Sequence, residues 1–410
     1  MGDSFEQNSQ PQAGLEPAKQ AAPFPVIGLG ASAGGLPALK DFFTHMPAES
    51  GMSFVVILHL SPKHESHAAA LLQATTGMPV TQVTEAVKVE PNHVYVIPPT
   101  KNLEMNDGHI NLIEQERLHG GQQVAIDLFF RTLGDTHQQN AVGIVLSGMG
   151  SDGTNGLKRI KEQNGLTFAQ DPKDAEHDSM PRHAINTGLV DFVLPVAEIP
   201  GKLIEIWRNA SRIKLPPETE PPPVVSQEDA EETALRDILM LLRSHTGHDF
   251  THYKRATVLR RIERRLQVNQ LQDITAYRDF IRGHPMEAQA LLKDLLISVT
   301  NFFRDRAAFD GFEREVVPVL FHEKTMGDMV RVWVAGCATG EEAYSVTMLL
   351  LEYAEQLASP PAIQIFATDI DEAAIRTARE GSYTETIEAD VSVERLRRFF
   401  TKEVGGYRVK

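Results

Sequence analysis

Several features that would mark whole classes of proteins are scarce in this chain. It has one cysteine, Cys337, in 410 residues, which excludes an internal disulfide and fits a reducing compartment. No apolar run approaches the ~20 residues that span a bilayer, and the N-terminus lacks the basic start and apolar stretch of a secretion signal. We therefore expect a cytoplasmic protein with no direct membrane insertion.

Positive charge is also scarce, with 40 lysines and arginines against 55 acidic residues and a net charge of -15. This balance argues against a nucleic-acid partner, since binding to a phosphate backbone needs an excess of basic side chains. The hydrophobic content of 42% is that of an ordinary globular chain. Its length is enough for two or three domains, each with its own core.

Two stretches without periodicity divide the chain. Residues 1–23 are rich in Gln, Pro and Ala and predict a disordered lead-in. A second break begins at Lys214-Leu-Pro-Pro-Glu-Thr-Glu-Pro-Pro-Pro, which is acidic, cannot continue a helix and predicts a linker. The expected parts are a lead-in (1–23), an α/β domain (24–210), a linker (211–227), a helical subdomain (228–300) and a second α/β domain (301–410).

In the first domain, short apolar runs alternate with amphipathic helices, a pattern that predicts a doubly wound, mostly parallel sheet covered on both faces. The expected strands are residues 26–30, 54–58, 94–97, 142–146 and 190–194. Residues 103–113, with Asp107-Gly108 in the middle, predict an appended hairpin.

A Gly-x-Ser-x-Gly pattern at residues 30–34 places Ser32 in a tight turn between the first expected strand and a helix. This context favours an exposed nucleophilic hydroxyl. A glycine-rich turn that binds phosphate or a dinucleotide fits the same residues.

Two other polar residues follow expected strands. His59 comes directly after residues 54–58, and Asp152 comes shortly after residues 142–146. Because parallel strands end at one edge of a sheet, a nucleophile, a base and an orienting carboxylate are predicted to meet there, as acyl transfer requires. Alternatively, Asp152 caps the helix that begins near Thr154.

The remaining histidines of this domain are expected to be solvated loop or surface residues. They are His64, His67, His93, His109 and His137. A metal site built from His59, His64 and His67 lacks further ligands at suitable spacing, so we expect none.

Four motifs of this domain resemble, in order, the catalytic domain of bacterial chemotaxis receptor methylesterases, CheB in type. They are Gly30–Gly35, Val55–Pro62, Leu146–Gly153 and Met180–Asn186, and the resemblance covers residues 24–209. It implies that Ser32 is the nucleophile, His59 the general base and Asp152 the third member of a triad. It also implies that Ala33 and Met149 line the site, where a backbone N–H stabilises the oxyanion.

The resemblance implies hydrolysis of glutamate methyl esters, and deamidation of glutamine, on the cytoplasmic helices of chemoreceptors, with no cofactor. Ala33 stands where family members often have threonine. No receiver domain of the kind that usually precedes this catalytic domain is expected from residues 1–23, so regulation by phosphorylation is not expected to act through this chain.

Downstream of the linker, residues 252–270 predict a basic amphipathic helix. Its basic residues are Lys254, Arg255, Arg260, Arg261, Arg264 and Arg265. Such a charged run forms either a solvated face or a docking surface for an acidic protein.

An α/β pattern then resumes, with strands expected at residues 330–335 and 363–368, a glycine-rich turn at 336–340 and a helix at 341–356. This order predicts the start of a Rossmann-like domain, and the acid at the end of its second strand suits ribose hydroxyls. NAD and S-adenosylmethionine fit this pattern equally well.

Three motifs decide between the two ligands, because Ser298–Arg304, Gly336–Ser345 and Ala367–Asp371 resemble the CheR-type receptor methyltransferases. The resemblance implies that the basic helix recognises acidic receptor helices. Ser298 stands where asparagine is common in the family, so one polar contact to the cofactor is not expected. The implied contacts to S-adenosylmethionine are Thr300, Arg304, Glu341 and Asp369.

The sequence thus predicts a bifunctional enzyme that adds and removes methyl groups on receptor glutamates. Because the chain stops at Lys410, soon after the second strand, we expect an incomplete methyltransferase that binds S-adenosylmethionine weakly or not at all. One alternative is a non-catalytic signalling module at the front of a larger sensor, continued by a sensor kinase. Another is a serine hydrolase of a different acyl substrate.

Overall fold

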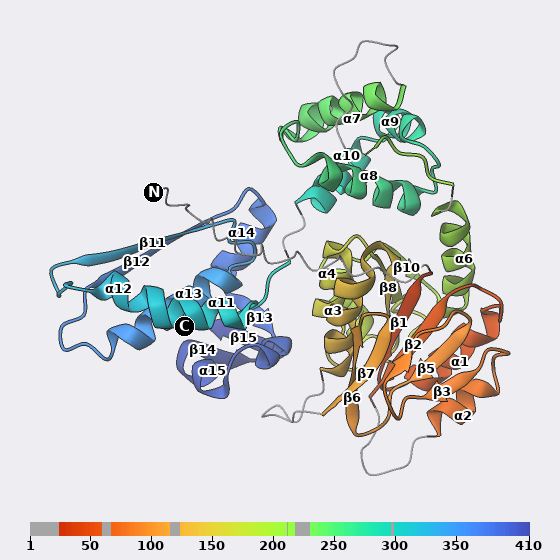
Figure 1. Ribbon diagram of the computed structural model, residues 1–410, viewed down its shortest axis with the longest axis horizontal. Helices are drawn as coiled ribbons and strands as arrows, with labels where there is room; N and C mark the ends of the chain where they lie inside the picture. Colours follow the sequence, from red (N-terminus) through yellow and green to blue (C-terminus); the bar gives the residue numbers. More distant parts are fainter. Residues whose placement is uncertain (1–23, 60–66, 115–123, 211, 218–229, 297–298) are drawn as a thin grey trace, which may run out of the picture.

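The computed structural model describes residues 24–59, 67–114, 124–210, 212–217, 230–296 and 299–410. The expected lead-in, most of the expected linker, His64 and Ser298 lie outside these residues. Figure 1 shows three groups of elements: a sheet with its helices, a helical group at the top and a second α/β group at the left.

The first group is built on a seven-stranded sheet in the order β10-β9-β8-β1-β2-β5-β3, and every pair in it is parallel. The strands are β1 (Val26–Ala31), β2 (Ser53–Leu58), β3 (Val80–Gln82), β5 (His93–Val96), β8 (Ala141–Val145), β9 (Leu166–Gln170) and β10 (Phe192–Leu194). Every residue of β1, β2, β8 and β9 is buried, as a parallel sheet covered on both faces requires.

Helices cover both faces of this sheet (Figure 1), as predicted. Alternate residues of β2 belong to opposite cores, with Phe54 and Val56 on one face and Val55 and Ile57 on the other. The first face carries α1 (Gly35–His45), α2 (Ala68–Gln73) and α6 (Ile199–Ala210). The second carries α3 (Ala125–His137), α4 (Thr154–Glu162) and α5 (Ser179–Asn186).

The predicted hairpin is present as β6 (Lys101–Asn106) and β7 (His109–Glu114), joined by Asp107 and Gly108 at φ angles of 48° and 72°. Two consecutive positive φ angles are what a two-residue hairpin turn needs. The short strand β4 (Val87–Lys88) pairs with β7. The prediction omitted β9, whose apolar signal is interrupted by two buried polar residues, Thr167 and Gln170.

The second group is a helical bundle. It consists of α7 (Ala230–Thr246), α8 (Arg255–Asn269), α9 (Ile274–Gly283) and α10 (Pro285–Leu295). Its core is formed by residues such as Leu235, Ile238, Leu242, Ile262 and Tyr277.

Helix α8 is the expected basic helix, and both interpretations of its charged run are wrong for three of its arginines. Arg261, Arg264 and Arg265 are buried. Arg264, only 1% exposed, pairs with Asp294 of α10 and with Asp191 of the first group. Lys161 joins the same cluster, 3.0 Å from Asp191 and 3.5 Å from Asp294. Arg264 therefore holds the helical bundle against the first group, whereas Arg265 pairs with Glu287 inside the bundle.

The third group contains a parallel pair, β11 (Met329–Ala335) and β12 (Ala362–Thr368), followed by an antiparallel sheet in the order β13-β15-β14. Both parallel strands lie within one residue of their expected bounds, which confirms the start of a Rossmann-like domain. The remaining elements are α11 (Arg306–Gly311), η3 (Phe312–Val316), α12 (Val317–Phe321), α13 (Glu341–Ala354), α14 (Glu372–Glu380), β13 (Ser382–Thr384), η4 (Glu385–Ala389), α15 (Val393–Phe399), β14 (Phe400–Glu403) and β15 (Gly406–Val409).

Among the described residues, no helix combines the length and the apolar character needed to cross a membrane.

We expect the substitution Arg264→Met to loosen the contact between the bundle and the first group. Removing one partner of a buried ion-pair cluster leaves Asp191 and Asp294 short of a counter-charge, which costs about 3–5 kcal/mol. Trp207 of the first group and Gln267 of α8 line the same cavity at this contact, so the fluorescence of Trp207 in a Trp333→Phe background reports separation during a urea titration. The midpoint should fall for Arg264→Met and stay unchanged for the exposed control Arg236→Met. Equal midpoints would contradict the assigned role of the cluster.

Candidate active site

The centre of the sheet has the topology that creates a crevice. From β1 the chain passes to α1 on one face, whereas from the neighbouring β8 it passes to α4 on the other face. Ligand sites of parallel sheets form at such reversals, beyond the carboxyl ends of the strands. Ser32 follows β1 and Asp152 lies between β8 and α4, so both lie at this crevice.

Backbone hydrogen bonds fix the turn that carries Ser32. Its N–H donates to the carbonyl of Ser147 at 3.0 Å, and its own carbonyl accepts from the N–H of Gly35 at 2.9 Å. Gly148 lies against this turn, since a Cβ there would be 2.9 Å from Cβ of Ser32 and 2.1 Å from Sδ of Met180. Only glycine lets the loop after β8 approach the serine this closely.

The glycines before Ser32 serve packing. A Cβ at Gly28 would lie 2.7 Å from the ring of Phe130, and one at Gly30 would lie 2.4 Å from Ile126. Both neighbours belong to α3, so these glycines let that helix approach β1. This accounts for the glycine pattern without a phosphate or dinucleotide ligand.

His59 lies beside Ser32 because of strand register. Parallel pairing of β1 with β2 places Ala31 opposite Leu58, and the N–H of His59 donates to the carbonyl of Ala31 at 3.2 Å. Ser32 and His59 are therefore the next positions on two neighbouring strands. The side chain of His59 is 18% exposed, so one side of the ring remains accessible.

Asp152 is the most constrained member of the set. Its side chain is 6% exposed, and its Oδ2 lies 2.8 Å from Nε2 of His59. It also accepts from the backbone N–H groups of Ile126, Asp127 and Gly153 at 3.0, 2.9 and 2.9 Å. Two of these donors belong to the first turn of α3. Asp152 therefore accepts the free N–H groups at the N-terminus of α3. The alternative that Asp152 caps α4 is wrong, because the N-cap of α4 is Gly153.

This arrangement defines the roles of the two ring nitrogens. A carboxylate only accepts, so Nε2 of His59 carries the proton and Nδ1 keeps its lone pair. Nδ1 is then the atom that can take the proton of the Ser32 hydroxyl. No hydrogen bond joins these two described residues in the structure, and such bonds often tighten only with substrate bound.

Asp127 is a site residue that sequence reasoning missed. Its Oδ1 accepts from the N–H of Gly156 at 2.7 Å, whereas its buried Oδ2 has no partner within the described part of the chain. Burial, and next the charge of Asp152, raise the pKa of Asp127 to about 7, and Arg131 opposes the rise. The available signal was an acid within the apolar run Ile126-Asp127-Leu128-Phe129 of an amphipathic helix.

The two expected lining residues lie close to Ser32. Ala33 follows it directly, and its carbonyl accepts from the hydroxyl of Ser147 at 3.0 Å. Met149 lies on the loop between β8 and α4 and is 64% exposed. Their part in catalysis stays a prediction.

Of the histidines expected at the surface, four lie among the described residues, and the expectation is wrong for one of them. His67 and His109 are exposed and His93 is half-buried, as loop or surface residues should be. His137 is buried instead, because it continues the apolar face of α3 one turn after Leu133, and burial lowers its pKa to about 4. Within the described ranges, no group of three or more His, Cys, Asp or Glu side chains could hold a metal ion.

The implied methyl-donor residues are only partly brought together. A cavity of about 110 Å³ is lined by Thr300 and Glu341. Asp369 lies at the end of β12, where it accepts from the N–H groups of Ala338 and Asp371, each at 2.8 Å. Arg304 does not line the cavity; its guanidinium donates to the carboxylate of Glu162.

Glu341 has a distinct electrostatic setting. Burial raises the pKa of its carboxyl, while a hydrogen bond from the hydroxyl of Thr339 at 2.5 Å and the nearby charge of Lys158 oppose the rise. A buried acid at a cavity favours a cationic ligand group.

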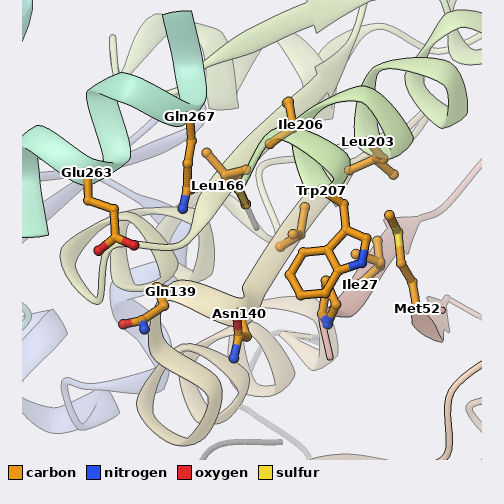
Figure 2. Close-up of a pocket in the computed structure, with 13 residues that line it drawn as sticks. Ile27, Met52, Gln139, Asn140, Leu166, Leu203, Ile206, Trp207, Glu263 and Gln267 are labelled. Carbon is orange, nitrogen blue, oxygen red and sulfur yellow. The ribbon is translucent and has the colours of Figure 1, made fainter. Parts of the chain in front are cut away.

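A further cavity, of about 200 Å³, lies at the opposite edge of the first sheet (Figure 2). Ile27, Met52 and Trp207 line it from the first group, and Glu263 and Gln267 line it from α8. The strand residues involved are near the amino ends of their strands, so this cavity is separate from the Ser32 crevice.

We expect the substitution Asp127→Asn to change the pH dependence of stability. The folded-state pKa of about 7 exceeds the ordinary value of 3.8, so the carboxyl favours the folded state at low pH and loses that effect as the pH rises to about 7. An asparagine does not titrate, so the variant does not lose stability at this position as the pH rises. The melting temperature of Asp127→Asn minus that of the wild type should therefore increase between pH 4 and pH 7 and then level off. The exposed control Glu85→Gln should show no such trend, and a constant difference for Asp127→Asn would contradict the assignment.

Family models match most of the described chain. A model described as CheB methylesterase matches residues 27–203. One described as the all-alpha domain of CheR methyltransferase matches residues 233–296, and one described as the SAM-binding domain of CheR methyltransferase matches residues 298–410.

Individual proteins agree with these matches. The chain is 36% identical over 356 residues to an uncharacterised 104.1 kDa protein of Rhodobacter capsulatus, covering 83% of this chain but only 37% of that protein. It is 31% identical over 194 residues to a putative protein-glutamate methylesterase/protein-glutamine glutaminase of Leptospira interrogans, covering 45% of this chain and 96% of that protein. The solved CheB methylesterase catalytic domain of Thermotoga maritima is 26% identical, with a TM-score of 0.42, and the match covers 45% of this chain and all of that one.

The Leptospira relative is matched over nearly its whole length, and the two CheR models match residues 233–296 and 298–410 of this chain. The chain therefore belongs to the CheB methylesterase family, and in it the methylesterase domain is followed by the all-alpha and SAM-binding domains of a CheR methyltransferase.

Proposed function

We propose that the first domain hydrolyses methyl esters of protein glutamates, and deamidates protein glutamines, through Ser32, His59 and Asp152. The observation that supports this most is the 2.8 Å contact between His59 and Asp152 at the edge of the sheet where Ser32 ends its strand. The substrates are the cytoplasmic helices of chemoreceptors, and we place the protein in the cytoplasm with them.

In the proposed mechanism, Oγ of Ser32 attacks the ester carbonyl carbon while Nδ1 of His59 takes the hydroxyl proton. Asp152 stabilises the resulting imidazolium through Nε2. Backbone N–H groups beside Ala33 and Met149 stabilise the oxyanion. Collapse of the tetrahedral intermediate breaks the bond to methoxide, which leaves as methanol with the proton from His59.

A water molecule completes the cycle by attacking the carbonyl carbon of the acyl-enzyme while His59 takes one of its protons. His59 then returns a proton to Oγ of Ser32 as the bond to the glutamate breaks, and the released acid ionises to the carboxylate. For a glutamine side chain the same steps release ammonia in place of methanol.

We propose that the C-terminal part binds S-adenosylmethionine, with Thr300, Arg304, Glu341 and Asp369 as its contacts. Charge supports this assignment, since a buried acid suits the cationic part of the cofactor and an acid at the end of β12 suits ribose hydroxyls. When bound, the cofactor supplies an electrophilic methyl group. A receptor glutamate is ionised near neutral pH and needs no general base, so the protein contributes chiefly positioning.

We expect Ser32→Ala to reduce methanol release from a methylated receptor peptide by about 10³-fold or more, because no other group can form the acyl-enzyme. The matched control is Ser50→Ala, at the amino edge of the same sheet, which should keep wild-type release. Undiminished methanol release by Ser32→Ala would rule out the serine mechanism.

A further inference from the structure

Helix α4 belongs to the methylesterase domain but also borders the methyltransferase cavity. It begins two residues after Asp152, and Asn155 and Lys158 on its outer side line the cavity beside Thr300 and Glu341. One helix therefore lies between the proposed esterase site and the proposed methyl-donor site.

The contact between the two parts is polar and specific. The amide of Asn155 donates to the hydroxyl of Thr386 at 2.5 Å. Arg131 of α3 donates to the carboxylate of Asp390 at 3.1 Å. These bonds hold the region around η4 against the two helices that flank Asp152.

Two further side chains of α4 meet the charged groups assigned to the methyl donor. Glu162 accepts from Nη2 of Arg304 at 2.9 and 3.1 Å. Lys158 is one turn earlier on the same helix and lines the same cavity as Glu341, where its charge opposes the effect of burial on the pKa of that carboxyl. Residues four apart share a helix face, so this face brings a carboxylate to Arg304 and an ammonium group to the cavity that Glu341 lines.

An ammonium group and a carboxylate side by side are also the functional groups of a free α-amino acid. The methionine end of S-adenosylmethionine carries both, and the proposed function assigns Arg304 and Glu341 to that cofactor. The volume of the cavity is also consistent with competition between α4 and the methyl donor. At about 110 Å³ the cavity is well below the ~300 Å³ at which pockets for small-molecule ligands begin.

We propose that two side chains of the methylesterase helix α4 take the places of the amino-acid end of the methyl donor. Glu162 stands in for its carboxylate at Arg304, and Lys158 stands in for its ammonium group near Glu341. Donor binding and docking of the methyltransferase domain on α4 then exclude each other. This inference rests on the proposed assignment of Arg304 and Glu341 to the cofactor site.

The test is calorimetric titration of the whole chain with S-adenosyl-L-homocysteine, the stable product that keeps the amino-acid end. The double substitution Lys158→Gln and Glu162→Gln removes both charges and should tighten binding by about 10-fold or more relative to the wild type. The matched control removes a similar pair on α6, by Lys202→Gln and Glu205→Gln, whose charged atoms are 3.3 Å apart away from the cavity. It should bind like the wild type.

Equal or weaker binding by the double variant would overturn the proposal, because the two charges would then be mere surface ion pairs or part of the cofactor site. Absence of detectable binding to both proteins would overturn it too, since something other than α4 would exclude the ligand. Unchanged methanol release from methylated peptide shows that the double variant is folded.

A third variant separates this inference from the proposed function. Glu341→Gln should weaken binding wherever binding is measurable, both in the wild type and in the double variant. If Glu341→Gln weakens binding but the double variant gains nothing, only the competition is wrong. If Glu341→Gln has no effect, the assigned methyl-donor site is wrong as well.

Discussion

The carboxylate of Asp152 is the group on which the proposed mechanism of the first domain depends. One oxygen meets the ring of His59, and both oxygens accept backbone N–H groups, two of them from the first turn of α3. Those donors reach Asp152 because α3 approaches β1 over two glycines, Gly28 and Gly30. The glycine-rich strand, the packing of α3 and the orientation of the His59 ring are thus parts of one arrangement. A larger residue at either glycine would displace the helix whose N-terminus fixes the carboxylate.

Much of this arrangement could be predicted from local sequence. The alternation of apolar runs and helices indicated a parallel sheet, and Asp107-Gly108 indicated the hairpin. That Ser32, His59 and Asp152 lie at one edge of the sheet could be predicted because parallel strands end there, which needs no knowledge of side-chain packing. Asp127 escaped notice because its environment depends on Asp152 and Gly156, 25 and 29 residues away along the chain.

The basic helix shows the same limit more clearly. Its spacing looked like a surface for solvent or for an acidic partner, yet Arg264 is buried against Asp294 and Asp191, which lie 30 and 73 residues away in sequence. Arg261 donates to the carbonyls of Lys161 and Glu162 at the end of α4, at 3.1 and 3.0 Å. Cations at a helix C-terminus are stabilising, so the guanidinium of Arg261 in α8 stabilises the C-terminal end of α4. Only the fold shows where the counter-charges are.

Helix α4 connects the two families of domains in this chain. Its N-terminal end adjoins Asp152, its C-terminal end is held by α8, and its outer face meets the methyltransferase domain. If the two domains add and remove the same methyl group, as we propose, the chain needs a way to keep the two reactions from cancelling. An element shared by both sites is placed to provide it.

The central claim is that Asp152 and His59 activate Ser32. Its most direct test is the rate at which a fluorophosphonate labels the protein, followed by mass spectrometry of the labelled peptide, in the wild type and in Asp152→Asn and His59→Gln variants. The account predicts a single adduct on Ser32, formed at least about 100-fold more slowly in either variant. An adduct on another residue, or equal rates in all three proteins, would contradict it.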